Sequence, residues 1–317
     1  MRIVFFGTPP TAVPSLEALL DAGHRPSLVV TQPDRPAGRG RSPVAPPVKR
    51  AAVEHGLDLV QPGKVRTRAF RERLAACEPD LLVVVAFGRI LSSRVLGLAR
   101  HGAINVHFSL LPRYRGAAPV QWALARGESL TGVTTMLMNE KMDEGDILMV
   151  REVGIEPGEH APSLQERLSR VGAELLVETL DELRGDSLEP RPQDHSAATL
   201  APLLERKHGY VDAGHPASEI EGRIRGFDPW PGVWLSRGGR RVRLVDARAL
   251  DEKPVSAPPG SLLELRDEGM VMACGEGTSL LLFQVQSEGR RVLGVRDAVN
   301  GRQLAVGDRL ERISETN

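Results

Sequence analysis

Short apolar runs recur along the first part of the chain, and stretches with helical apolar spacing lie between them. Residues 80–86 are apolar at almost every position, as in a strand of a parallel sheet that is buried on both faces. The runs at 2–6 and 27–31 are also predicted strands. Alternation of strands and helices predicts an α/β fold with a doubly wound, Rossmann-like parallel sheet. Helices are predicted over 12–22, 48–55, 67–77, 119–125 and 162–183, and two further strands over 131–138 and 147–155.

The alternation of predicted strands and helices ends near residue 187, and short strands follow further on. This change predicts a second domain. Residues 188–205 gather proline and polar residues with little hydrophobic periodicity, as expected of a linker. We therefore expect a first domain over 1–187 and, after the linker, a small OB-like β-barrel over 206–317. The barrel strands are predicted over 233–236, 241–245, 261–265, 269–273 and 279–285.

Polar side chains converge at the end of one predicted strand. Asn105 and His107 alternate with apolar neighbours, so they share one face of the strand, which ends before Pro112. The acidic loop 142–146 follows the strand at 131–138 and can deliver Asp143 beside the imidazole. An amide, an imidazole and a carboxylate suit acyl transfer to an amine, with roles in oxyanion binding, proton transfer and orientation of the histidine. The residues alone leave a structural alternative open, in which these side chains cap turns and satisfy a strand end.

Composition excludes several classes of protein. The chain has 41 basic and 41 acidic residues, so it is no polybasic protein and any nucleic-acid surface must be local. Cys77 and Cys274 lie far apart, and no cluster of histidine, cysteine and carboxylate has the spacing of metal ligands, so no metal is expected. The first apolar run is too short for a signal peptide. We therefore expect a cytoplasmic protein with no membrane partner.

Positive charge is nevertheless concentrated in two places. Residues 34–50 hold five basic residues and one acid. Most of these charges lie in the stretch 32–47, which is too rich in Pro, Gly and Arg to predict regular structure. Residues 223–248 hold seven arginines and two aspartates, within the predicted barrel. Arginine-rich segments of this kind contact phosphates well. The basic residues singled out as RNA contacts are Arg35, Arg39, Arg41, Arg240, Arg241 and Arg243.

The motif that starts at Asn105 and ends with Arg115-Gly116, together with the acidic loop 142–146, resembles the folate-dependent formyltransferases. Residues 116–121 and the string at 35–40 narrow the resemblance to the branch that formylates initiator methionyl-tRNA. The resemblance implies 10-formyltetrahydrofolate as co-substrate and an OB-like second domain. It also implies that Asn105, His107 and Asp143 are catalytic and that Arg39 contacts the acceptor stem. The implied folate pocket comprises Phe87, Gly88, Ile90, Ser109, Leu110, Leu111 and Pro112.

Two other functions remain to be weighed against this prediction. A nucleotide-sugar N-formyltransferase would use the same three catalytic residues and the same donor, but it has no need of the basic string at 35–40. An RNA-binding module without catalysis would be expected to keep the basic segments and lose the catalytic residues, all of which are present. The favoured reading is therefore an enzyme, expected to act as a monomer, that formylates initiator methionyl-tRNA.

Overall fold

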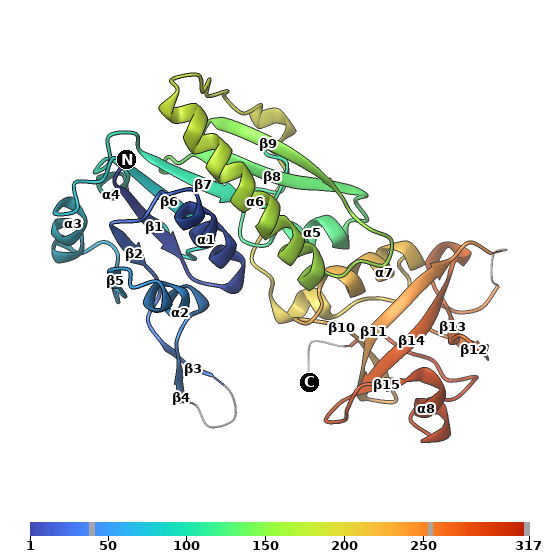
Figure 1. Cartoon of the computed structure of the whole chain (residues 1–317). Helices are drawn as coiled ribbons and strands as arrows, with labels where there is room; N and C mark the ends of the chain where they lie inside the picture. The colour runs from blue at the N-terminus through green and yellow to red at the C-terminus, as the bar shows by residue number, and fades with distance from the viewer. Residues whose placement is uncertain (38–41, 253–255, 314–317) are drawn as a thin grey trace. The chain divides into compact units, whose positions relative to one another are not determined.

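The computed structural model describes residues 1–37, 42–252 and 256–313, which form two compact units (Figure 1). The first unit comprises residues 1–119, 130–154 and 165–202. The second comprises 120–129, 155–164 and the chain from residue 203 onward. The domain boundaries at 187 and 206 stay a prediction.

A seven-stranded sheet organises the first unit, with the order β5-β2-β1-β6-β7-β8-β9. The first five strands in this order are parallel, whereas β8 and β9 are antiparallel. The predicted Rossmann-like α/β class is confirmed, as a mixed sheet. A short loop joins β8 to β9, and short connections produce antiparallel neighbours. The strands are β1 (Ile3–Gly7), β2 (Leu28–Val30), β5 (Leu59–Val60), β6 (Leu81–Val85), β7 (Ala103–His107), β8 (Leu130–Leu137) and β9 (Ile147–Gly154).

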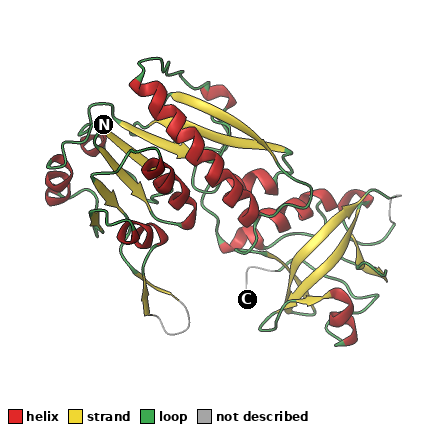
Figure 2. Ribbon diagram, viewed as in Figure 1, coloured by secondary structure: helices red, strands yellow, loops and turns green. Residues whose placement is uncertain are grey.

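Helices accompany this sheet (Figure 2), and the apolar side chains of its central strands are buried. Every residue of β1 and β6 is buried, as the near-continuous apolar runs predict. The ring of Phe6 makes edge contacts with Phe70 and Phe87, at centroid distances of 6.5 and 5.3 Å. The long helix α6 packs against the β8 side, where the hydroxyls of Thr135 and Thr179 lie 2.8 Å apart. The helices are α1 (Val13–Asp21), α2 (Pro47–Glu54), α3 (Arg68–Ala75), α4 (Ser93–Leu96) and α6 (Ala161–Arg184).

The prediction that the basic stretch lacks regular structure is wrong for part of it. Strands β3 (Arg35–Ala37) and β4 (Ser42–Val44) pair as a two-stranded antiparallel ribbon. Pro36 lies opposite Pro43 in this ribbon. Opposed residues in such a ladder alternate between pairs that exchange hydrogen bonds and pairs that do not, so two prolines fit at a pair of the second kind.

The second unit contains an antiparallel sheet with the order β10-β11-β14-β13-β12, and β15 pairs with β14. Residues 309 and 311 bridge to Ser261 and Ser236, which lie at the two opposite edges of this order. Bridges of this kind bring the two edges of a sheet towards closure into a barrel. The OB-like assignment stays a prediction. The strands are β10 (Val233–Arg237), β11 (Arg240–Leu250), β12 (Leu262–Leu265), β13 (Met270–Ala273), β14 (Ser279–Ser287) and β15 (Leu293–Gly294).

The second unit includes helices α5 (Pro119–Ala125), α7 (Ala217–Gly226) and α8 (Val295–Asn300). The helix predicted over 119–125 is confirmed, whereas the apolar pattern predicted neither α7 nor α8. Gly226 shows how closely α7 packs, because a Cβ there would lie 2.4 Å from the carbonyl oxygen of Gln121 in α5. Within the described ranges, no helix has the length and apolar character needed to span a membrane.

Candidate active site

Strand β7 carries the two polar side chains and lies where the pairing in the sheet changes from parallel to antiparallel. Asn105 pairs with Val84 of β6 on the parallel side and with Met136 of β8 on the antiparallel side. His107 is the last residue of β7 and lies opposite Thr134 of β8. Ligands of α/β sheets bind beyond the carboxyl ends of parallel strands, and His107 lies at this position.

The His107 ring is held between two oxygen atoms. Its Nε2 lies 2.9 Å from the carbonyl oxygen of Tyr114, and its Nδ1 lies 3.8 Å from Oδ2 of Asp143. A carbonyl oxygen can only accept a hydrogen bond, so Nε2 carries the hydrogen in this arrangement. Nδ1 is therefore the nitrogen that can accept a proton, and the carboxylate lies beside it. The side chain is 6% exposed, so once His107 has accepted a proton its attraction to the carboxylate is partly shielded from water.

Asp143 is held in place through its side chain and its backbone. The backbone N–H of Gly116 donates to Oδ2 of Asp143 at 2.8 Å. The residue itself has a φ of 54°, in the left-handed region that non-glycine residues seldom adopt. Gly116 is required for a different reason, because a Cβ there would lie 2.4 Å from the carbonyl oxygen of Ala201.

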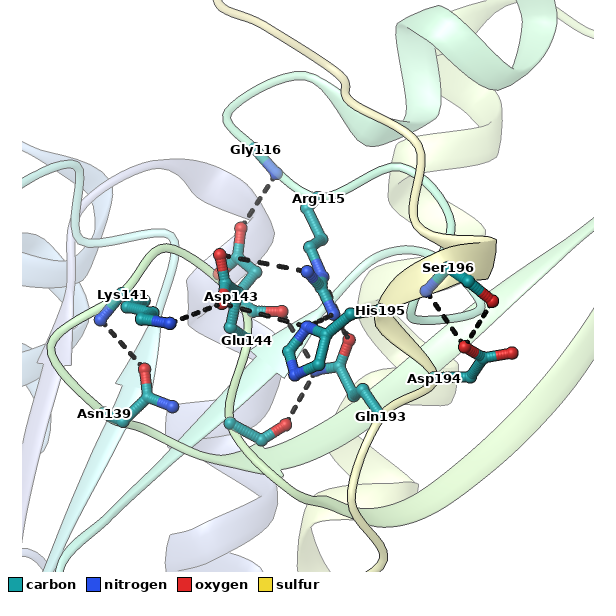
Figure 3. A network of polar contacts seen from close by, with 11 residues as sticks. Arg115, Gly116, Asn139, Lys141, Asp143, Glu144, Gln193, Asp194, His195 and Ser196 are labelled. Carbon is teal, nitrogen blue, oxygen red and sulfur yellow. Dashed lines mark hydrogen bonds and ion pairs between the residues drawn. The ribbon is translucent and has the colours of Figure 1, made fainter.

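A polar network that the sequence did not predict supports this loop (Figure 3). The side-chain amide of Gln193 donates to the carbonyl oxygens of Asp143 at 2.9 Å and Gly145 at 2.7 Å. Arg115 donates to Oε1 of Gln193 from Nε at 3.0 Å and from Nη2 at 2.7 Å. Nη2 of Arg115 also lies 3.1 Å from Nδ1 of His195. Of the residues in this network, only Arg115 could have been noticed in the sequence, because it directly precedes the glycine of the motif.

The residues of the predicted folate pocket lie in two segments, after β6 and after β7. Phe87 is 2% exposed and packs in the core, while its carbonyl oxygen accepts hydrogen bonds from Thr8 and Gln32 at 3.1 and 2.8 Å. Gly88 has a φ of 75°, and Ile90 is 59% exposed. The backbone and the exposed side chains of this segment are therefore what a ligand could touch, rather than the Phe87 ring.

The second segment, residues 109–112, is tightly bound to its surroundings. Ser109 is fully buried, and its hydroxyl donates to the carbonyl oxygen of Arg113 at 2.7 Å. Thr134 donates from its hydroxyl to the carbonyl oxygen of Ser109 at 2.7 Å. The peptide bond between Leu111 and Pro112 is cis, and Leu111 is buried. The folate roles of this segment, Leu110 included, stay predictions.

The basic residues singled out for RNA occupy different environments. Arg39 and Arg41 lie outside the described residues. Arg35 is exposed and donates to Oε1 of Gln32 at 2.6 Å. Nearby, hydrogen bonds from Gln61 and Lys49 hold the pKa of Asp34 below its ordinary value.

The three predicted arginines of the second unit also differ. Arg240 is exposed, and within the described part of the chain its side chain makes no hydrogen bond or ion pair. Arg241 lies 3.5 Å from Glu288. Arg243 pairs with Asp228 at 2.9 Å, and its side chain is only 15% exposed. Arg243 is therefore poorly placed to reach a ligand. Across residues 1–37, 42–252 and 256–313, no group of three or more potential ligand residues could hold a metal ion.

Comparison with known proteins places both parts of the chain in one family. Residues 1–180 match the formyl transferase family, and residues 203–303 match the formyl transferase C-terminal domain. The methionyl-tRNA formyltransferase of Acidobacterium capsulatum is 47% identical over 98% of this chain and 99% of its own length. That of Myxococcus xanthus is 45% identical over 96% of each chain.

Solved structures with the same fold are more distant in sequence. The N-formyltransferase of Helicobacter canadensis, in complex with folinic acid and dTDP-3-aminofucose, superposes with a TM-score of 0.66 at 16% identity. The match covers 90% of this chain and 99% of that chain. Glycinamide ribonucleotide transformylase 1 of Symbiobacterium toebii superposes with a TM-score of 0.51 at 23% identity, over 61% of this chain and 94% of that one. At these identities the likeness concerns the fold alone.

Proposed function

The chain belongs to the methionyl-tRNA formyltransferase family, and we propose that it transfers the formyl group of 10-formyltetrahydrofolate to the α-amine of methionyl initiator tRNA. The observation that carries the chemistry is the carboxylate of Asp143, 3.8 Å from Nδ1 of His107 at the end of β7. The product is N-formylmethionyl-tRNA. We place the reaction in the cytoplasm, with a monomeric enzyme and no metal.

The chemistry assigns one task to each polar group. The neutral α-amine attacks the formyl carbon, and the carbonyl oxygen becomes an oxyanion that the Asn105 amide stabilises by donating a hydrogen bond. Nδ1 of His107 accepts the proton that the amine loses, and Asp143 balances the resulting charge. The carbon–nitrogen bond to the folate then breaks, and the folate nitrogen takes up a proton. The Tyr114 carbonyl keeps the imidazole oriented throughout.

An assay with two acceptors tests this function. The purified protein is given 10-formyltetrahydrofolate with either methionyl initiator tRNA or a 4-amino nucleotide sugar. We expect formylation of the tRNA and none of the sugar. Formylation of the sugar alone would establish the alternative, a nucleotide-sugar N-formyltransferase, and reject the proposed function.

The β3–β4 ribbon is the first place where we expect contact with RNA. Arg39→Ala should raise the KM for tRNA at least tenfold and leave folate binding unchanged, because the expected phosphate contact involves the tRNA and not the donor. Steady-state kinetics with each substrate varied in turn measure both effects. Arg100→Ala is the control. Arg100 is exposed and precedes β7, so it lies at the end of that strand opposite to His107. Equal losses toward folate and tRNA in the Arg39 variant would contradict the assignment.

The second expected RNA contact is a basic end of the antiparallel sheet, formed by residues 237–241, 287–291 and 301–303. Hydrogen bonds join these segments: among them, the N–H of Glu288 donates to the Arg241 carbonyl at 3.0 Å, and Arg237 donates to the Gln303 carbonyl at 2.7 Å. Together the segments hold six arginines and one glutamate in a chain of zero net charge. This concentration of charge suits an RNA backbone. The arginines are Arg237, Arg240, Arg241, Arg290, Arg291 and Arg302.

Arg240 and Arg243 provide a matched test of this surface. Arg240→Ala should lower the slope of log affinity for tRNA against log salt by roughly 0.7 to 0.9, the value for one lost phosphate contact. Arg243→Ala should leave the slope unchanged and lower stability, because Arg243 is mostly buried against Asp228. Filter binding over a range of salt concentrations measures the slopes. An unchanged slope in the Arg240 variant would remove this residue from the RNA contacts.

A further inference from the structure

We propose that Gln193 is a positioning residue, which holds the loop between β8 and β9 so that the Asp143 carboxylate stays beside His107. Gln193 lies in the segment 188–205, which the sequence pattern assigns to a linker. Residues 188–202 of this segment belong to the first unit, in which Arg191 bridges to Ile147 and Leu200 bridges to Arg115. The inference rests on the proposed function, because it concerns a group of the formyl transfer site.

The loop needs support because Asp143 has a left-handed backbone conformation and Gly145 lies very close to β8. Asp143 has a φ of 54°, in the left-handed region, which costs free energy for a residue with a side chain, although less for an aspartate than for most other residues. The loop also runs close to β8, since a Cβ on Gly145 would lie 1.7 Å from the carbonyl oxygen of Leu137. Gln193 donates one hydrogen bond to the carbonyl oxygen of each of these loop residues, at 2.9 and 2.7 Å. The two bonds hold the backbone on both sides of Glu144.

Gln193 is itself held by the segment that grips the Asp143 side chain. Arg115 donates two hydrogen bonds to Oε1 of Gln193, and the next residue, Gly116, donates its N–H to Oδ2 of Asp143. The contacts form a closed ring that runs through Arg115, Gln193, Asp143 and Gly116. Gln193 and Arg115 are each 6% exposed, so water is poorly able to replace these bonds.

This ring fixes the carboxylate relative to the imidazole. The separation of 3.8 Å between Oδ2 and Nδ1 depends on the loop backbone as well as on the Asp143 rotamer. A displacement of about 1 Å in a catalytic group can cost on the order of 10²-fold in rate. Gln193 is not required to touch either substrate for this effect, so it should influence kcat and leave KM nearly unchanged.

A double-mutant cycle with Gln193→Met and Asp143→Asn tests the proposal. Gln193→Met alone should lower kcat for formyl transfer by roughly 10- to 100-fold, the consequence expected of a misplaced group, with both KM values within about twofold. In the Asp143→Asn background, the same change should cost less than about twofold, because there is no carboxylate left to position. Equal losses in the two backgrounds, or no loss in the first, would overturn the proposal. Gln165→Met, on helix α6, is the control for the substitution itself.

A second variant separates the two halves of the Gln193 amide. Gln193→Glu keeps an acceptor for Arg115 but places a carboxylate oxygen against the two loop carbonyls, so it should lose activity as Gln193→Met does. Full activity in the Glu variant, or unfolding of both variants by circular dichroism, would overturn the positioning role. The wild-type enzyme is assayed first with both acceptors. Activity on the amino sugar alone would reject the proposed function while leaving the Gln193 cycle measurable on that acceptor.

Discussion

Replacing His107 with alanine is expected to lower turnover at saturating donor and acceptor by about 10² or more, the scale of a lost acid–base group. The reason is that Nδ1 of His107 is the group beside Asp143 that can take the proton of the attacking amine. Steady-state kcat with formylfolate and methionyl-tRNA measures the effect. Asn105→Ala should produce a loss of similar size through the oxyanion, which needs a hydrogen-bond donor.

The fold should survive this change, since among the residues that the structure describes the His107 ring makes one hydrogen bond, to the Tyr114 carbonyl. Circular dichroism and folate binding should therefore match the wild type. His101→Ala is the matched control, because His101 lies in the turn that leads into β7, at the end remote from the candidate site. If the His107 variant kept near-normal kcat, the proton-transfer role would have to be abandoned.

Replacing Gly145 with alanine is expected to be nearly as damaging, through geometry instead of chemistry. A Cβ at this position would lie 1.7 Å from the Leu137 carbonyl oxygen, which belongs to the backbone of β8 and cannot move aside alone. The loop must shift, and with it the two carbonyl oxygens that Gln193 holds. We expect kcat to fall on the order of 10²-fold and the free energy of unfolding to fall by roughly 1–3 kcal/mol.

Thermal and urea denaturation, measured beside kcat, separate the two effects. Gly154→Ala is the control on the same hairpin, because a Cβ at Gly154 meets no atom within 4 Å. The control should keep both its activity and its stability. A Gly145→Ala enzyme with wild-type kcat would show that the loop tolerates displacement, which would also weaken the positioning argument for Gln193.

Several elements could be predicted from the sequence because the order of their apolar and polar residues reflects which faces of the element are buried. Strand β6 is apolar throughout since both faces of a central parallel strand are covered, and all of its residues are buried. Helix α6 was recognisable from one apolar face repeated over many turns, and the structure has it at 161–184. The β3–β4 ribbon was not predicted, because its prolines suggest a loop. That the two prolines lie opposite each other depends on the register of the two strands, which the local sequence does not reveal.

The sequence by itself determined the α/β class, the strand that carries Asn105 and His107, and the family to which the chain belongs, because these depend on short-range spacing and on a long motif. The end of this strand at His107, several residues before Pro112, comes from the structure. The nearness of Asp143 to His107 was an expectation that only the pairing of β7 with β8 could decide. The roles of Gln193 and Arg115 depend on tertiary structure altogether. Residues 78 positions apart come together in a buried hydrogen-bonded ring, and no periodicity along the chain encodes which distant carbonyl a buried amide will meet.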